Sequence, residues 1–136
     1  MAQSTLNQLA KAILAQPVFV HLAVVQPDGT PHSTPVWVDI DGDNVIINTA
    51  LGRSKAKSIH KDSIVAISLL DPKNPYQAIA FGGRVIDVTE EGADAHIDFL
   101  AKKYLGVDTY PNRQPGERRI KIVIRPEKIW MQPSEN

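Results

Sequence analysis

The sequence contains no cysteine and no long apolar run. Without cysteine the chain can form neither a disulfide framework nor a cysteine nucleophile, and it suits a reducing cytoplasm. No window approaches the roughly 18 uninterrupted apolar residues of a membrane-spanning helix, and the N-terminus lacks the basic-then-apolar layout of a secretory signal. We therefore expect a cytoplasmic protein that does not bind a membrane. Its length of 136 residues predicts a single domain over 1–136.

Aromatic residues are few, and charge of neither sign is in excess. The chain has three Phe, three Tyr and two Trp, and its 15 basic residues balance 15 acidic ones. A general nucleic-acid coat needs net positive charge, and a barrel that binds single-stranded nucleic acid needs aromatic platforms among its cations. Such a nucleic-acid-binding barrel would use the cations Arg118, Arg119 and Lys121, but the small number of aromatic residues argues against it. We expect no nucleic-acid partner.

The motifs of several common enzyme classes are also absent. The chain has no Gly-x-Ser-x-Gly elbow, no Walker phosphate loop, no Gly-x-Gly-x-x-Gly and no His-Glu-x-x-His. No pair of carboxylates stands out as an acid and a base. The histidines fall on separate predicted elements at spacings that match no metal site, with His21 expected inside a barrel and His96 on a helix surface. We expect no metal ligand and no catalytic side chain.

Alternating apolar residues and turn residues predict a mainly β fold. Three helical patterns lie near the N-terminus, after Gly52 and over 93–104. The predicted strands are 18–25, 32–40, 44–50, 63–70, 76–88 and a final long strand through Ile120, Ile122 and Ile124. Regular β-α-β alternation is absent, so we expect a closed or split antiparallel barrel of five to six strands with helices at its margins.

Two positions predict irregularities in these strands. Pro35 cannot donate a hydrogen bond to a neighbouring strand, so strand 32–40 should be bulged or lie at an edge there. Gly82-Gly83 should mark a bulge or a sharp bend in strand 76–88. The first three strands should form a meander, and strand 18–25 is apolar enough to be buried on both faces.

The segment from Gly52 to Lys61 concentrates positive charge. No acidic residue lies between Asp43 and Asp62, although the segment holds Arg53, Lys55, Lys57 and Lys61. A strand, a glycine turn and a helix start with Ser54 as its N-cap together predict an anion site, because free backbone N–H groups and cations meet there. The plain alternative is a solvated basic surface helix.

The order of several motifs resembles one family. The run Asp28-Gly29-Thr30-Pro31-His32-Ser33-Thr34-Pro35-Val36-Trp37 resembles the first signature of the flavin/deazaflavin oxidoreductases, the pyridoxamine-phosphate-oxidase-like split-barrel proteins. Asn48-Thr49 followed by Gly52-Arg53-x-Lys55-x-Lys57 resembles the second, and the closing Ile129-Trp130 falls in similar order. The resemblance covers nearly the whole chain. It implies a six-stranded antiparallel split β-barrel of Greek-key type with three peripheral helices, and a homodimer that binds its cofactors in the grooves between subunits.

The resemblance also implies the site. It assigns the cofactor phosphate to Arg53, Ser54, Lys55 and Lys57, where the charge pattern independently predicts an anion. It assigns the ribityl hydroxyls to Asn48 and Thr49, the ring to the backbone around Thr34, Pro35 and Val36, and the wall from the second subunit to Gln77 and Trp130. Simple dimer packing is an equal alternative for Trp130, and an outer-face aromatic is the plain alternative for Trp37.

Two cofactors fit this resemblance. FMN carries one phosphate, whereas the deazaflavin coenzyme F-420 adds an acidic tail that needs further cations along its exit path. Lys57 and Lys61 offer them, as do Arg119, Lys121 and Arg125 if the last strand borders the groove, so we favour F-420. The Arg-Leu-x-Pro substrate element of pyridoxamine-phosphate oxidase itself is missing. The expected function is hydride transfer to a small organic substrate, and the alternatives are an FMN-dependent oxidase-like enzyme and a barrel that binds flavin or haem without turnover.

Overall fold

The computed structural model describes residues 5–133, except for the side chains of Ser54 and Lys55. This part of the chain forms three helices and seven strands. They are α1 (Gln8–Leu14), β1 (Val20–Val25), β2 (Pro31–Val36), β3 (Asp39–Asp41), β4 (Asn44–Ala50), α2 (Ser54–Ser58), β5 (Ile64–Asp71), β6 (Asn74–Thr89), α3 (Ala93–Leu105) and β7 (Arg119–Gln132).

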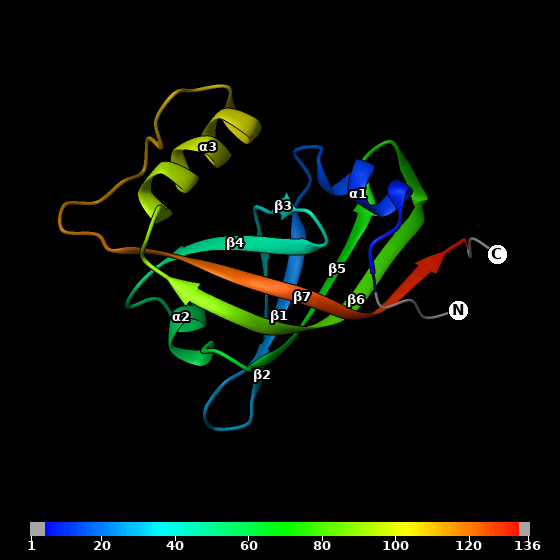
Figure 1. The fold of residues 1–136 in the computed structure, drawn as a ribbon, viewed down its shortest axis with the longest axis horizontal. Helices are drawn as coiled ribbons and strands as arrows, with labels where there is room; N and C mark the ends of the chain where they lie inside the picture. Colours follow the sequence, from blue (N-terminus) through cyan, green and yellow to red (C-terminus); the bar gives the residue numbers. More distant parts are fainter. Residues whose placement is uncertain (1–4, 134–136) are drawn as a thin grey trace.

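The strands form one antiparallel sheet in the order β2-β1-β5-β6-β7-β4-β3, which curls into a split β-barrel (Figure 1). The edge strands β2 and β3 follow each other in the chain, yet they lie at opposite ends of the sheet order. The barrel is therefore split between them, and α3 packs on β4 and β7 beside this split. The predicted split barrel with peripheral helices is confirmed, with seven strands instead of six.

The core lies inside the barrel. Inward-facing residues of β1, β4, β5, β6 and β7 alternate with outward-facing ones, and Ile13 and Leu14 of α1 close the cluster with at most 1% of their surface exposed. Fully burying each such side chain contributes about 1.5–3 kcal/mol. None of the helices within 5–133 is long and apolar enough to cross a bilayer.

The prediction of one strand over 32–40 was wrong, and so was the meander built on it. β2 pairs with β1, whereas β3 pairs with β4 at the other end of the sheet. Trp37 and Val38 separate the two strands, and the backbone N–H of Val38 donates to the hydroxyl of Tyr104 at 2.9 Å instead of to a strand. A side chain of α3 thus ends the strand, which local sequence cannot show. The edge position predicted from Pro35 is confirmed.

The prediction that 18–25 is buried on both faces was also wrong. Residues of β1 alternate between buried and accessible, and His21 is exposed instead of packed inside the barrel. The outward face of β1 is uncovered within one chain.

The glycine pair behaves as predicted. The pairing of β6 with β7 shifts register between Gly82 and Gly83. A Cβ on Gly83 would lie 2.6 Å from Cγ2 of Ile124 and 3.1 Å from the carbonyl oxygen of Arg125, so only glycine allows this close approach of the two strands.

Helix α2 of the basic segment is shorter than expected, at five residues. Arg53, not Ser54, occupies the N-cap position, with φ −77° and ψ 154° and without a side-chain capping bond. The segment therefore contributes a turn and a short helix, and its cations must act mainly through their side chains.

Candidate functional site

A cavity of about 190 Å³ opens at the split of the barrel. It lies between the end of β2, the face of β4 below α3, and the start of β7, so it is built from residues far apart in the sequence. Its lining residues are Phe19, Pro35, Val36, Trp37, Asn48, Arg53, Ile97, Leu100, Tyr110, Asn112 and Arg119. We call it the split cavity.

Aromatic rings form one wall of the split cavity. Trp37 stacks on Tyr104 with 4.8 Å between ring centroids and 9° between ring planes, and Tyr110 meets Trp37 edge-on at 6.1 Å. The hydroxyl of Tyr104 accepts from Val38 N and donates to the carbonyl of Val18, and burial raises its pKa to about 12. Tyr104 thereby fixes the backbone at Val38, directly after Trp37, and at Val18 before β1, so this wall is preorganised.

Polar groups form the opposite wall. Arg119 is buried, and its Nε donates to Oδ1 of Asn48 at 2.7 Å. Its Nη1 lies 3.0 Å from Glu117 Oε1, outside hydrogen-bonding geometry, and has no hydrogen-bond partner among the residues described. Its guanidinium sits over the ring of Tyr110 at 5.1 Å, while Arg53 stands 3.9 Å from the same Glu117 oxygen. Two cations therefore face the cavity, and one retains an unsatisfied donor.

His96 closes the wall from α3, which corrects its predicted place on a helix surface. Only 9% of its side chain is exposed, and its Nε2 lies 2.9 Å from Asp39 Oδ2. Its Nδ1 lies 3.1 Å from Asn48 Nδ2, which also donates to the carbonyl of Ala93 at 2.9 Å. Burial alone would raise the pKa of Asp39, but the hydrogen bonds from His96 and Ile40 N, with the charges of His96 and Lys103, hold it below its ordinary value.

The structure brings together four of the predicted site residues, because Pro35, Val36, Asn48 and Arg53 all line the split cavity. Asn48, however, uses its amide for the contacts just described. Thr34 is half-buried on β2 and does not line the cavity.

Thr49 and the remaining cations lie elsewhere. Thr49 points into the barrel, on the face of β4 opposite to Asn48, and its hydroxyl meets no partner in the described part of the chain. Lys57 is exposed on α2. The side chains of Ser54 and Lys55 lie outside the described residues.

Gln77 and Trp130 do not line the split cavity of their own chain. Gln77 is buried at the start of β6 and donates to the carbonyl of Gln132. Trp130 is 48% exposed and lies eleven residues along β7 from Arg119, roughly 35 Å of strand at about 3.3 Å per residue.

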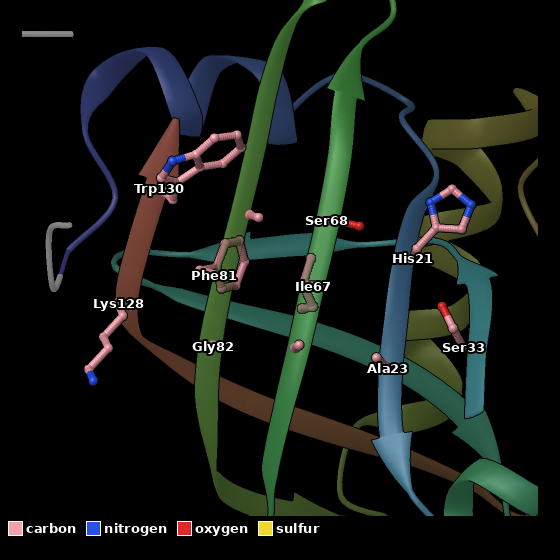
Figure 2. Close-up of a pocket in the computed structure, with 11 residues that line it drawn as sticks. His21, Ala23, Ser33, Ile67, Ser68, Phe81, Gly82, Lys128 and Trp130 are labelled. Carbon is pink, nitrogen blue, oxygen red and sulfur yellow. The ribbon is translucent and has the colours of Figure 1, made fainter. Parts of the chain in front are cut away.

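A second, shallow cavity of about 360 Å³ covers the outward face of the sheet (Figure 2). Trp130 on β7 and His21 on β1 stand on either side of β5 and β6, and directly between them these strands present the small side chains of Ser68 and Ala80. We call this surface the outer sheet face. Its small residues are Ala23, Ser33, Ala66, Ser68, Ala80 and Gly82.

Sequence reasoning missed part of the split cavity. It gave Trp37 no role in the site and kept an outer-face aromatic as its plain alternative. It considered Arg119 only for an acidic tail or for single-stranded nucleic acid, and it did not assign Tyr110. One signal was available: Arg119 and Lys121 share the face of β7 opposite to Ile120, so the apolar side of α3 had to cover them. Within 5–133 no three His, Asp or Glu side chains are grouped so as to hold a metal ion.

Comparisons with known proteins agree with this geometry. The family model described as pyridoxamine 5'-phosphate oxidase matches residues 6–133. The solved structure of an F-420 reductase is similar, with 30% sequence identity and a TM-score of 0.79, over 92% of this chain and 98% of that one.

Two more distant structures share the fold. A Listeria innocua protein proposed to be a pyridoxamine 5'-phosphate oxidase has 21% identity and a TM-score of 0.67, over 90% of this chain and 94% of that one. HupZ of Group A Streptococcus has 20% identity and a TM-score of 0.65, over 95% of each chain. No match was found among curated proteins. The family match and the 30% identity show that the chain belongs to the pyridoxamine 5'-phosphate oxidase-like family of flavin-binding split-barrel oxidoreductases.

Proposed function

We propose that the protein binds the deazaflavin F-420, with FMN as the alternative, and transfers a hydride between this cofactor and a small organic substrate. The observation that carries the proposal is the split cavity, in which Arg53 and Arg119 lie beside the aromatic wall of Trp37 and Tyr110. A planar ring with a phosphate on a flexible chain needs both features. The similarity to an F-420 reductase supports the choice of cofactor.

The residues present fit such a group. The buried Nη1 of Arg119 forms an ion pair with Glu117 Oε1 at 3.0 Å but no hydrogen bond within the described residues, so it is free to donate to a ligand oxygen or a water. Arg53 is half-exposed at the cavity rim, where a phosphate stays accessible to the Lys57 side of α2. The cavity of about 190 Å³ is smaller than the roughly 300–1,000 Å³ of sites that enclose a drug-sized ligand, so it can hold only part of the cofactor.

In this proposal the protein binds and orients. When bound, the cofactor supplies the hydride chemistry. Arg53 holds the phosphate, Arg119 donates to a polar edge of the ligand, and the edge strand β2 leaves backbone groups around Pro35 free for the ring. Trp37 and Tyr110 exclude water from one side. No acid or base side chain is required, in keeping with the small number of titratable groups in the cavity.

The rest of the cofactor needs a second surface, and we propose that a second copy of the chain provides it. The outer sheet face exposes Val25, Ile64, Leu70 and Trp130 by 48–62%. The rows of small residues on this face allow a second sheet to approach closely. In a C2 dimer the same patch of each subunit contacts the other, so this face can pair with the identical face of a second copy. A dimer of this kind would bring Trp130 of one copy towards the site of the other, whereas Gln77 lies on the buried face of β6 and would not take part.

The experiment is a separate titration of the purified protein with FMN and with F-420, followed by fluorescence. Arg53→Ala should weaken cofactor binding by about tenfold to a hundredfold, because a hydrogen bond to a charged group is worth about 1.5–3 kcal/mol. The matched control is Arg118→Ala, which removes the same charge close by but does not line the cavity. Absence of binding to both cofactors would refute the proposal, as would equal affinities of the two variants.

The same titration separates the two cofactors. Lys57 and Lys61 are exposed beyond Arg53. Replacing both by alanine should weaken the binding of F-420, which carries an acidic tail, and leave the binding of FMN nearly unchanged. Turnover is then measured by cofactor absorbance after adding organic acceptors. Saturable binding without oxidation of the reduced cofactor by any acceptor would favour a binding protein over an enzyme.

A further inference from the structure

The wall of the split cavity contains a continuous line of polar contacts from Asp39 through His96 and Asn48 to Arg119. Each member comes from a different element, namely β3, α3, β4 and β7. The contacts measure 2.9, 3.1 and 2.7 Å in that order. The function proposed above uses only the last member, so the role of the other three needs a separate explanation.

The donors and acceptors of this line can be assigned from its two fixed ends. Arg119 Nε can only donate, so the Asn48 atom that faces it must be the oxygen. The Asn48 nitrogen then faces the carbonyl of Ala93 and Nδ1 of His96, and it has one hydrogen for each. His96 Nδ1 must therefore accept, which leaves its proton on Nε2, directed at Asp39.

This assignment has one consequence for Arg119. If His96 also carried a proton on Nδ1, two donors would oppose each other across the contact with Asn48. Turning the Asn48 amide would not help, because its nitrogen would then oppose Arg119 Nε and its oxygen would oppose the carbonyl of Ala93. A second proton on His96 therefore removes the acceptor that fixes the Asn48 amide, and this weakens the hold of Asn48 on the guanidinium of Arg119.

Charged groups from the neighbouring elements lie around His96. Asp39 from β3 contacts it directly, and Lys103 from α3 acts on Asp39. Arg119 from β7 is connected to it through Asn48, and Lys121 of the same strand lies near Gly92. Glu117 and Arg53 stand behind Arg119 and partly balance each other.

We infer that His96 is a positioning residue: as a neutral imidazole protonated on Nε2, it fixes the Asn48 amide, which holds Arg119 in the wall of the split cavity. The consequence for the ligand rests on the proposed function, whereas the arrangement itself does not. On acidification, a second proton on the ring weakens the hold of Asn48 on Arg119 and thereby weakens binding of the ligand.

The first test uses the ligand-free wild type and nitrogen-15 NMR of its histidine rings. At neutral pH, His96 should show a protonated Nε2 and a bare Nδ1, and the Nε–H of Arg119 should be protected from exchange. That protection should disappear on acidification together with the second protonation of His96. A proton on Nδ1 at neutral pH, or a protected Arg119 signal after His96 is doubly protonated, overturns the inference whatever ligand the protein binds.

The second test compares variants in the FMN and F-420 titrations. His96→Leu removes the acceptor and should weaken binding about tenfold or more. His96→Asn places an acceptor near the former Nδ1, so it should restore the affinity for the cofactor. Because asparagine does not gain a proton, the fall in affinity on acidification should disappear in this variant. His60→Asn changes an exposed histidine and is the control. Equal affinity and pH dependence in all four proteins would overturn the inference, whereas failure of the wild type to bind either cofactor would refute the proposed function and leave the NMR result to decide.

Discussion

The hydroxyl of Tyr104 ties α3 to the barrel, and its removal is a quantitative test of the structure. Tyr104→Phe keeps the ring on Trp37 but leaves the N–H of Val38 and the carbonyl of Val18 without this partner. Each buried group left unsatisfied costs about 1–3 kcal/mol, and partial access of water reduces the sum, so we expect about 2 kcal/mol. An unfolding entropy of about 2.1 cal/mol/K per residue over 136 residues gives roughly 0.3 kcal/mol/K, hence a fall in Tm of about 7 °C.

The pH dependence of the difference in stability between the wild type and Tyr104→Phe provides a second readout. Burial raises the pKa of Tyr104 from 10.0 to about 12 in the folded protein. Because the folded value is the higher one, the hydroxyl contributes its full stability below pH 10 and loses it as the pH rises towards 12. Phe has no such group, so the gap between wild type and variant should narrow over this range. Lys103 titrates in both proteins, and its contribution cancels.

The assay is urea unfolding followed by circular dichroism, at neutral pH and at several alkaline values. Tyr76→Phe is the control. Tyr76 is 82% exposed, so this variant should have the same stability as the wild type. The reasoning is refuted if Tyr104→Phe matches Tyr76→Phe in stability, or if its deficit is the same at neutral pH and near pH 12.

Two further predictions concern the sheet. Gly83→Ala should lower the free energy of unfolding by about 1–3 kcal/mol, because its Cβ would lie 2.6 Å from Ile124 Cγ2. Gly82→Ala is the control and should resemble the wild type, because no atom lies nearer than 3.9 Å to its Cβ. Equal losses of stability in the two variants, measured by denaturant unfolding, would contradict this prediction. Ala80→Arg places a charge between Ser68 and Trp130 on the outer sheet face, so the variant should elute as a monomer where the wild type elutes as a dimer and should bind cofactor more weakly. A wild type that is monomeric by light scattering would show that the outer sheet face does not pair copies of this chain.

Local sequence predicted the elements whose causes are local. The glycine pair at Gly82-Gly83 and the proline at Pro35 each impose a backbone constraint wherever they occur, and both were read correctly. Gly106, which predicted the end of the third helix, lies just after α3 with φ 72°. The resemblance carried the barrel itself, since its motifs span nearly the whole chain.

Two of the errors concern groups whose partners are distant in sequence. The N–H of Val38 is taken by Tyr104, 66 residues away, and this contact divides the predicted strand 32–40 in two. His96 is buried because Asp39 and Asn48 meet it from two strands. Neither pairing leaves a periodic signal in the sequence around it.

The sequence by itself determined the antiparallel barrel, its edge strand and the cation-rich turn at Arg53, because hydrophobic alternation, proline and glycine act through the local backbone. Only the tertiary structure decided that Arg119, Tyr110 and Trp37 line one cavity with Asn48, and that His96 supports the polar wall of this cavity. The physical reason is that α3 covers the split of the barrel and removes water from it. Polar groups buried there must bond to one another, although they are far apart along the chain.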